Sequence, residues 1–556
     1  MFEKNLEVLH NDALKRRLAK ISATKANANI SYCVAPSNDY VLLKDEVPTD
    51  DLTNPRKAIT DMLDKNIRTE MRNNDIIIAF GIGLGYLLDE TFNRYPSKIF
   101  LYEPDLELLH FVLNNVDISE HLASGRVFIT NDMDELLSKL SSTFVTKDKV
   151  EIVYLNNYAI IKNKELLLLT QKVYDICKTK MVDINTITKF SRQWMVNTLS
   201  NIAEINNKSM YKLSDLEGKF SGQTAIVAGA GPSLKDNIEK IKKDRNKFIL
   251  FAVNKAVGYL LDNDVVPDFV VCLDALNMER TIGNYSSRLV NTNCIADIRT
   301  DCYLPKVGFQ KTFLNFSETD FFIKKLMNFN PDIKLYDIGG TASSFALVAA
   351  AKMGFSKIIL AGIDLAFKNN EIYAYDDKMN RISLDEILVD GVKKRVVQVQ
   401  SVTGRKVSTR EDYEAFITHF ATIIKELNHQ GIYNISSFGA NIEGAKNKPL
   451  DEIQLIPNIN MFDVENAEPF KLQLKEFIQD EFANINNIIS VLAKGVFSPE
   501  LVATIVKSVF VYQYMQSEIL TVLQKNFEQE LADEFINNTK VAIKTVVDLL
   551  QKNKLI

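Results

Sequence analysis

Short apolar runs alternate with amphipathic stretches along most of the chain, and this alternation predicts parallel sheets covered by helices. The run Ile76 to Phe80 is followed by a glycine-rich turn, a helical pattern and a second apolar run at Lys98 to Tyr102. A strand, a helix and a strand in this order form a βαβ unit. Strand candidates at 126–129 and 150–154 extend it, so we expect a Rossmann-like α/β domain followed by a helical connector.

A second α/β series begins at Thr224 with Ala-Ile-Val-Ala before another glycine-rich turn. Further strand candidates follow at 248–253, 269–273, 333–336, 357–360 and 433–436. Helical segments between several of them favour a mainly parallel sheet covered on both faces. Because ligands of such sheets bind beyond the carboxyl ends of the strands, we expect the site in the loops that follow them.

After Pro469 the pattern changes to long amphipathic stretches at helical spacing. The expected fold class is α/β, with two Rossmann-like, mainly parallel α/β domains followed by an all-α helical C-terminal domain. The expected segments are an N-terminal preface at 1–70, a Rossmann-like domain with its connector at 71–206, a central domain at 207–465 and a helical bundle at 466–556.

Composition narrows the class of protein. The 556 residues are 46% hydrophobic and 25% charged, which excludes disordered, collagen-like and disulfide-scaffold classes. The net charge of -5 gives no reason to expect a nucleic-acid partner. The five cysteines form no CxxC pair or zinc-binding spacing, the N-terminus has no signal-like apolar segment, and no apolar stretch is long enough to span a membrane. We therefore expect a cytoplasmic protein without membrane contact or bound metal.

The strongest candidate motif is Gly-Ala-Gly-Pro-Ser-Leu, which follows the first strand of the second series. Glycines let a backbone approach a ligand, and free amides at the start of the next helix attract a phosphate. The motif lacks the Lys of a Walker A loop and the third glycine of GxGxxG. A tight turn without a ligand is the alternative. The candidate nucleotide-binding residues are Gly229, Ala230, Gly231, Pro232, Ser233 and Leu234.

Polar residues follow later strands as well. Asn254, Asp274 and Asp364 each stand just beyond a strand candidate, where a polar side chain faces the crevice of an open sheet. Asn254 and Asp274 also fit a helix cap or a turn.

Two more loops carry candidate residues. Gly339 and Gly340 precede an apolar helix, and Thr341 and Ser343 can offer hydroxyls beside its amides to an anion or a sugar. A compact loop and an ordinary helix cap are the alternatives. Glu443, beyond the last strand, can accept a proton or bind a ribose hydroxyl, although a lone carboxylate there is more often a solvated loop acid.

The first series has its own triplet, Gly81, Gly83 and Gly85, with Glu103 about twenty residues further on, as in dinucleotide and methyltransferase folds. A glycine triplet alone is weak evidence. We favour a module that packs or recognises protein there.

With these motifs in order, the chain resembles the bacterial motility accessory factor (Maf) family of flagellin glycosyltransferases. The likeness rests on GxGxG in the first domain, on GAGPSL, PDFVVCLDA, GGTASS and AGIDLAF in the second, and on the helical tail. The central domain is also similar to the CMP-sialic-acid-dependent bacterial sialyltransferases, with Ala230 where their Gly-Asn-Gly-Pro-Ser loop has Asn, and to archaeal hydroxymethylpterin diphosphokinases.

The resemblance implies a sialyltransferase-like catalytic central domain. It would transfer a nonulosonic acid, of the pseudaminic or legionaminic type, from a CMP donor to Ser or Thr of flagellin, as flagellum assembly and motility require. Flagellin would be the partner, no cofactor or metal would be needed, and an oligomer is left open. Two other functions also stay open: diphosphate transfer from ATP to a pterin-like alcohol, and a non-catalytic flagellin-binding assembly factor.

For glycosyl transfer the expected roles divide between phosphate and acceptor. The amides of Gly231 to Leu234 would stabilise the phosphate, and Asp274 or Asp364 would be the base that takes the acceptor's proton. The remaining contacts would be Ser233 and Asn254 to phosphate or ribose, and Thr341 and Ser343 to the sugar or cytidine.

Overall fold

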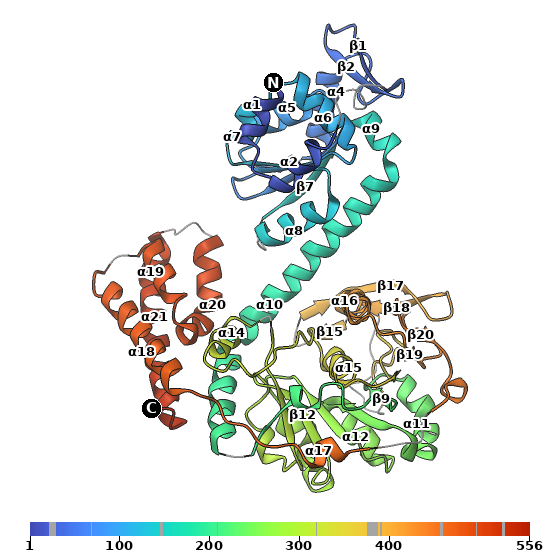
Figure 1. Cartoon of the computed structure of the whole chain (residues 1–556), viewed down its shortest axis with the longest axis vertical. Helices are drawn as coiled ribbons and strands as arrows, with labels where there is room; N and C mark the ends of the chain where they lie inside the picture. The colour runs from blue at the N-terminus through green and yellow to red at the C-terminus, as the bar shows by residue number, and fades with distance from the viewer. Residues whose placement is uncertain are drawn as a thin grey trace. The chain divides into compact units, whose positions relative to one another are not determined.

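The computed structural model describes residues 1–21, 29–67, 69–144, 148–207, 209–318, 320–374, 387–389, 392–455, 460–495, 497–524 and 529–556. They form two compact units, Met1–Ile184 and Asn185–Ile556 (Figure 1). The boundary between the units falls inside the long helix α10 (Asn163–Asn207). The expected preface and residues 71–184 of the expected first domain lie in the first unit. Residues 185–206, expected to belong to the connector of that domain, lie in the second unit together with the expected central and helical segments.

A four-stranded parallel sheet in the order β6-β5-β4-β7 forms the centre of the first unit. One of its two inner strands, β4, has the sequence Ile-Ile-Ile-Ala-Phe and is buried along its whole length, as expected for a strand covered on both faces. The strands are β4 (Ile76–Phe80), β5 (Lys98–Tyr102), β6 (Val127–Thr130) and β7 (Val150–Tyr154). A small antiparallel sheet is formed by β1 (Ile30–Val34), β2 (Tyr40–Lys44) and β3 (Val47–Pro48).

Short helices surround the sheet of the first unit. They are α1 (Phe2–Val8), α2 (Asp12–Leu18), α4 (Pro55–Asn66), α5 (Tyr86–Arg94), α6 (Leu106–Asn115), α7 (Ser119–Ala123), α8 (Met133–Thr143) and α9 (Asn156–Ile161).

The second unit is built on a nine-stranded parallel sheet in the order β20-β19-β14-β9-β10-β11-β12-β13-β8. The chain runs outward from β9 to β13 and then returns to β14 on the other side of β9, so the topological switch lies between β9 and β14. The strands are β8 (Tyr211–Lys212), β9 (Thr224–Ala228), β10 (Ile249–Val253), β11 (Phe269–Cys272), β12 (Asn293–Asp297), β13 (Thr312–Asn315), β14 (Lys357–Ala361), β19 (Ile432–Asn434) and β20 (Lys446–Asn447). The strand expected at 333–336 is wrong, because only Tyr336 forms an isolated bridge there, to Ser317.

Helices cover this sheet on both faces. Side chains of α11 (Ser233–Lys243) and α12 (Asn254–Asp262) share one core with the C-terminal half of α10. Side chains of α15 (Ala342–Lys352) and α16 (Glu411–Leu427) belong to the core on the other face. The fold class is therefore the expected α/β arrangement followed by helices. Two hairpins, β15 (Ile387–Val389) with β16 (Val392–Lys394) and β17 (Val396–Gln400) with β18 (Lys406–Arg410), stand between β14 and α16.

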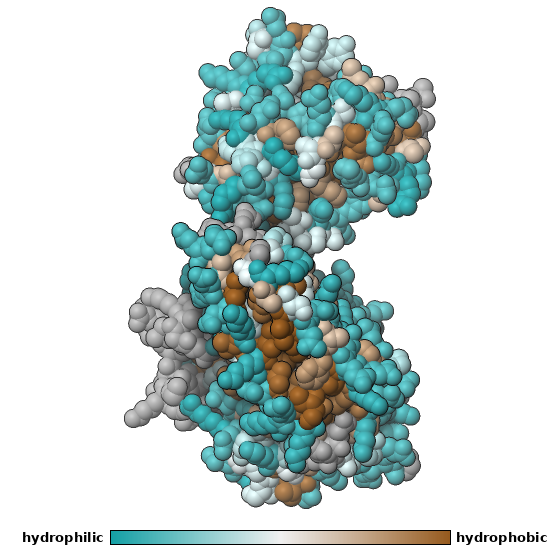
Figure 2. Space-filling model, turned by 90° about the vertical axis from the view of Figure 1, so that its left-hand side faces the viewer, coloured by the Kyte–Doolittle hydropathy of each residue, from teal (hydrophilic) through white to brown (hydrophobic). Residues whose placement is uncertain are grey.

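The C-terminal helices pack on α14 (Phe321–Met327) within the second unit. The rings of Phe322 and Phe510 lie 5.2 Å apart, and the Nζ of Lys325 lies 2.6 Å from Oε1 of the buried Glu481. Figure 2 shows apolar side chains gathered on the face that carries these helices. The C-terminal helices are α18 (Lys475–Leu492), α19 (Pro499–Ile505), α20 (Val509–Gln524) and α21 (Ala532–Lys552). Ile489 of α18, Leu523 of α20 and Val541 of α21 are exposed. Two short helices lie earlier in the second unit, α13 (Met278–Ile282) and α17 (Phe462–Glu465). In the described part of the chain, none of the helices has the length and apolar character of a membrane span.

Candidate functional site

The glycine loop after β9 packs against the loop after β14. The N–H of Gly229 donates to the carbonyl of Ala361 at 2.8 Å, and the N–H of Gly231 donates to the carbonyl of Gly362 at 2.8 Å. A Cβ on Gly229 would stand 2.5 Å from the carbonyl oxygen of Gly362, and one on Gly362 would stand 2.4 Å from that of Gly229. Glycine is needed at both positions because two backbones, rather than a backbone and a ligand, approach each other.

The side chain of Asp364 lies at the N-terminus of helix α11. Its Oδ2 accepts the backbone N–H of Ser233 at 2.8 Å, and its Oδ1 accepts the hydroxyl of Ser436 at 2.6 Å. The side chain is 2% exposed, and this burial raises the pKa of its carboxyl. A carboxylate of the chain itself thus stands where the loop was expected to bind a phosphate.

The remaining groups of this loop are also engaged. The N–H of Leu234 donates to the carbonyl of Gly231 at 3.0 Å, and Pro232 has no N–H. Ala230, Pro232, Ser233 and Leu234 are all buried. The expectation that the amides of Gly231 to Leu234 face a phosphate does not fit this arrangement, and neither does the expectation that Asp364 faces the crevice.

The side chains of Asn254 and Asp274 contact each other beyond the ends of the neighbouring strands β10 and β11. Asn254 begins α12 directly after β10, and Asp274 follows β11. The Nδ2 of Asn254 donates to Oδ2 of Asp274 at 2.7 Å. Asn254 is 2% exposed whereas Asp274 is exposed, so the amide fixes a carboxylate that faces solvent at the carboxyl end of the sheet.

Thr341 and Ser343 stand at the start of α15, on the opposite face of the sheet from α12. Because α15 runs antiparallel to the strands and contacts β9, β10 and β11, its first turn lies at their carboxyl ends. Thr341 caps the helix by accepting the N–H of Ser344 at 3.0 Å. The N–H groups of Ala342 and Ser343 have no intrahelical acceptor, and none of the described residues supplies another. This helix start, unlike that of α11, is open to an anion.

Two glycines shape the loop before α15. Gly339 has φ +69°, and a Cβ there would stand 2.6 Å from Nε2 of the half-buried His419 on α16. Gly340 is exposed, with open space around it. His419 therefore packs against the loop at Gly339, whereas Gly340 faces solvent.

Glu443 is not brought to the other predicted residues. It is exposed in the loop after β19, and none of the contacts among the described residues joins it to Asn254, Asp274 or Thr341.

Lys255, the neighbour of Asn254, was not among the site residues predicted from the sequence. Its side chain is exposed, with Nζ 5.7 Å from the centre of the Tyr373 ring, and no described carboxylate lies within ion-pair distance. Tyr373 packs with Tyr413 and Val396 at the base of the β17–β18 hairpin, so the segment after β14 reaches Lys255. In the sequence, the signal that could have indicated a role for Lys255 was its position next to Asn254.

Two asparagines of α10, also missed, hold the loops that carry this site. The Nδ2 of Asn197 donates to the carbonyls of Ala275 at 2.8 Å and Arg299 at 3.0 Å. The Nδ2 of Asn201 donates to the carbonyls of Ile298 and Thr300, both at 2.8 Å. The two side chains lie one helical turn apart, and together they fix the segments after β11 and β12, beginning directly beside Asp274.

The glycine triplet of the first unit is filled by side chains. A Cβ on Gly81 would stand 2.7 Å from the Tyr158 ring, and one on Gly83 would stand 2.9 Å from Leu155. Glu103 is fully buried and accepts the N–H of Ile82 at 3.0 Å and the hydroxyl of Tyr158 at 2.5 Å. Burial raises the pKa of Glu103 to about 7. Glu103, at the position whose carboxylate would bind a ribose in a dinucleotide fold, is therefore hydrogen-bonded to other residues of this chain.

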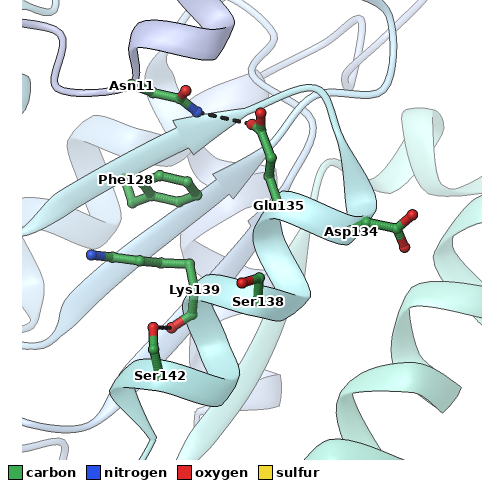
Figure 3. A pocket seen from close by; sticks show the side chains of 7 residues that line it. All are labelled: Asn11, Phe128, Asp134, Glu135, Ser138, Lys139 and Ser142. Atoms are coloured by element: carbon green, nitrogen blue, oxygen red, sulfur yellow. Dashed lines mark hydrogen bonds between the residues drawn. The ribbon is translucent and has the colours of Figure 1, made fainter. Parts of the chain in front are cut away.

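A shallow cavity of about 540 Å³ lies elsewhere on the first unit (Figure 3). Its Glu135 accepts hydrogen bonds from Asn11 and from the Arg17 guanidinium, which holds the pKa of that carboxyl down at about 2. The cavity contains none of the predicted site residues; it is lined by Asn11, Phe128, Asp134, Glu135, Ser138, Lys139 and Ser142. Within the described residues, no three His, Cys, Asp or Glu side chains gather as a metal site requires.

Three comparisons with known proteins bear on this geometry. Residues 196–370 match the family described as "6-hydroxymethylpterin diphosphokinase MptE-like". An uncharacterised protein of Treponema pallidum (strain Nichols) is 29% identical over 110 residues, which are 19% of this chain and half of the relative's length. The solved structure of the MAf glycosyltransferase from Magnetospirillum magneticum AMB-1 aligns with all of this chain and 95% of its own, at a TM-score of 0.67 and 16% identity.

The chain has the MAf glycosyltransferase fold. The resemblance drawn from the sequence motifs is confirmed at this level, over the whole chain. The MptE-like match covers the part of the chain that contains β9, Asn254, Asp274 and Asp364.

Proposed function

We propose that the protein is a glycosyltransferase that moves a nonulosonic acid, of the pseudaminic or legionaminic type, from a CMP donor to Ser or Thr hydroxyls of flagellin. In this proposal it acts in the cytoplasm and is needed for flagellum assembly and motility. The observation that carries the proposal is the likeness of the whole chain to the MAf glycosyltransferase, together with the exposed Asp274 and its partner Asn254 at the carboxyl ends of β10 and β11.

The donor phosphate would bind at the first turn of α15. The N–H groups of Ala342 and Ser343, which bond to none of the described residues, lie at a helix start, where the helix dipole favours an anion. The hydroxyl of Ser343 and the open backbone at Gly340 lie beside them. The same donors would stabilise the charge that develops on CMP as it leaves.

Asp274 is the residue that we assign as the base. The bond between the anomeric carbon and the phosphate oxygen breaks, and CMP leaves with the electron pair. The acceptor oxygen bonds to the anomeric carbon, and its proton passes to Asp274. Asn254 holds one carboxylate oxygen at 2.7 Å and leaves the other free for this task. Asp364, in contrast, is proposed to position the loop between β9 and α11 rather than to touch substrate.

The proposal is tested by incubating the purified protein with a CMP-nonulosonate and flagellin from the same organism and measuring the mass of flagellin. We expect a mass increase of one sugar for each modified site. The Asp274→Asn variant should bind CMP as wild type does and lose transfer by at least about a hundredfold, as expected for removal of a general base. An unchanged flagellin mass with authentic substrates would contradict the proposal.

A second candidate function is diphosphate transfer from ATP to a pterin-like alcohol, which the MptE-like match over residues 196–370 favours. It differs in its substrates, so magnesium-dependent formation of AMP from ATP in the presence of 6-hydroxymethylpterin separates it from glycosyl transfer. We expect no AMP above the level of a heat-inactivated control.

A further inference from the structure

Lys255 is an exposed cation beside the proposed donor site. It follows Asn254 directly, on the first turn of α12, and its side chain is exposed. Among the described residues no carboxylate neutralises it, although Asp274 lies next to its neighbour Asn254. The face of the Tyr373 ring, 5.7 Å from its Nζ, favours the ammonium group at this place.

The crevice offers two different kinds of anion binding from two faces of the sheet. The open start of α15 provides backbone amides and the hydroxyl of Ser343, which suit the oxygens of a phosphate. Lys255 comes from α12 on the other face and provides a single point charge.

A nonulosonic acid carries its carboxylate on the same carbon that bears the phosphate oxygen. A CMP-nonulosonate therefore brings two negative groups into the crevice, close to the carboxylate of Asp274. Like charges in one site repel unless a cation stands among them. A donor with a neutral sugar would bring only its phosphate charge.

We infer that Lys255 pairs with the carboxylate of the donor sugar and so selects sugar acids over neutral sugars, an inference that rests on the proposed function. The phosphate is held separately at α15. Lys255 then acts in substrate selection, and its charge also offsets the repulsion between the donor carboxylate and Asp274.

The test measures how tightly the full-length protein binds three ligands by calorimetry without acceptor: CMP, CMP-N-acetylneuraminic acid and the methyl ester of that acid. The variant is Lys255→Met, which has a side chain of similar length without the charge. The matched control is Lys240→Met on α11, whose ammonium pairs with Asp451 and is not part of the proposed donor site. Lys255→Arg tests whether a second cation restores selection.

We expect wild type and Lys240→Met to bind the acid about tenfold more tightly than the ester. Lys255→Met should bind acid and ester equally and should bind CMP as wild type does, and Lys255→Arg should regain most of the preference. Equal weakening of all three ligands in Lys255→Met would overturn the inference, and so would a preference for the acid that survives the substitution. If wild type binds none of the three, the proposed function fails together with the inference, whereas binding of CMP with no dependence on Lys255 overturns the inference alone.

Discussion

The Oδ2 of Asp364 accepts the backbone N–H of Ser233 at 2.8 Å and thereby occupies the start of helix α11. A glycine-rich turn before a helix is usually interpreted as a phosphate site because its amides are free. Here the chain supplies its own carboxylate, which is buried and also accepts the hydroxyl of Ser436. The open helix start of the crevice is that of α15.

Replacing Asp364 by Ala should destabilise the fold. The N–H of Ser233 and the hydroxyl of Ser436 would lose their acceptor in a buried place, which costs about 2 to 4 kcal/mol in the free energy of unfolding. Asp364→Asn should lose less, because its oxygen can accept from Ser233 and its amide can donate to Ser436. Urea unfolding followed by circular dichroism measures both. Wild-type stability in Asp364→Ala, with weakened CMP binding, would instead mean that the carboxylate faces the ligand.

Gly362→Ala should be the more damaging of two glycine substitutions in the central domain. At Gly362 the backbone has φ +65° and an added Cβ would stand 2.4 Å from the carbonyl of Gly229, so the two loops must separate. We expect a loss of about 2 to 4 kcal/mol in the free energy of unfolding. Gly340→Ala is the control, because its Cβ meets open space, and its stability should stay within about 0.5 kcal/mol of wild type. Equal effects in urea unfolding would contradict the close approach of the two loops.

The apolar patterns predicted the layers of the fold because they report burial directly. The run Ile76 to Phe80 is a buried strand as expected, and the strands around Thr224 lie in one parallel sheet. The candidate site was harder to predict. A glycine is equally consistent with the approach of a ligand and with that of another backbone, so Gly229 and Gly231 could not reveal that Gly362 and Asp364 lie against them.

Other parts of the site depend on contacts between distant segments. Asn254 and Asp274 were predicted from their places after strands, and they do meet. Asn197 gave no signal, because an asparagine in an amphipathic helix is indistinguishable in the sequence from a solvated one. Its importance follows only from the two carbonyls, 78 and 102 residues further along the chain, that its amide contacts.

Glu103 should make the stability of the protein depend on pH. Its pKa is raised to about 7 in the folded state, above the ordinary value of 4.5, because the carboxyl is buried. Protonated Glu103 therefore makes its full contribution to the free energy of unfolding below about pH 4.5. As the pH rises through about 7, this contribution is lost and the free energy of unfolding falls by roughly 3 kcal/mol. The difference in free energy of unfolding between wild type and Glu103→Gln, measured in urea from pH 4.5 to 8, should fall by this amount. A difference that does not change with pH would show that Glu103 titrates normally.

Asn197→Ala should impair transfer through the loop that carries Asp274. The carbonyls of Ala275 and Arg299 would lose their donor, at a cost of about 1 to 3 kcal/mol, and the loop would be held less firmly. We expect kcat for transfer to fall several-fold more than the affinity for CMP, because the phosphate site proposed at α15 does not include this loop. Thr188→Ala, an exposed position on the same helix, is the control and should match wild type in both. Loss of affinity without loss of kcat would argue against the assigned role of the loop.

The most direct test of the account is an experimental structure of the full-length protein with CMP bound. We expect nucleotide density at the carboxyl ends of β10 and β11, with the phosphate at the N–H groups of Ala342 and Ser343 and with Asp364 still bonded to Ser233. CMP beside Gly229 to Ser233 with Asp364 displaced, or CMP bound in the first unit, would contradict it.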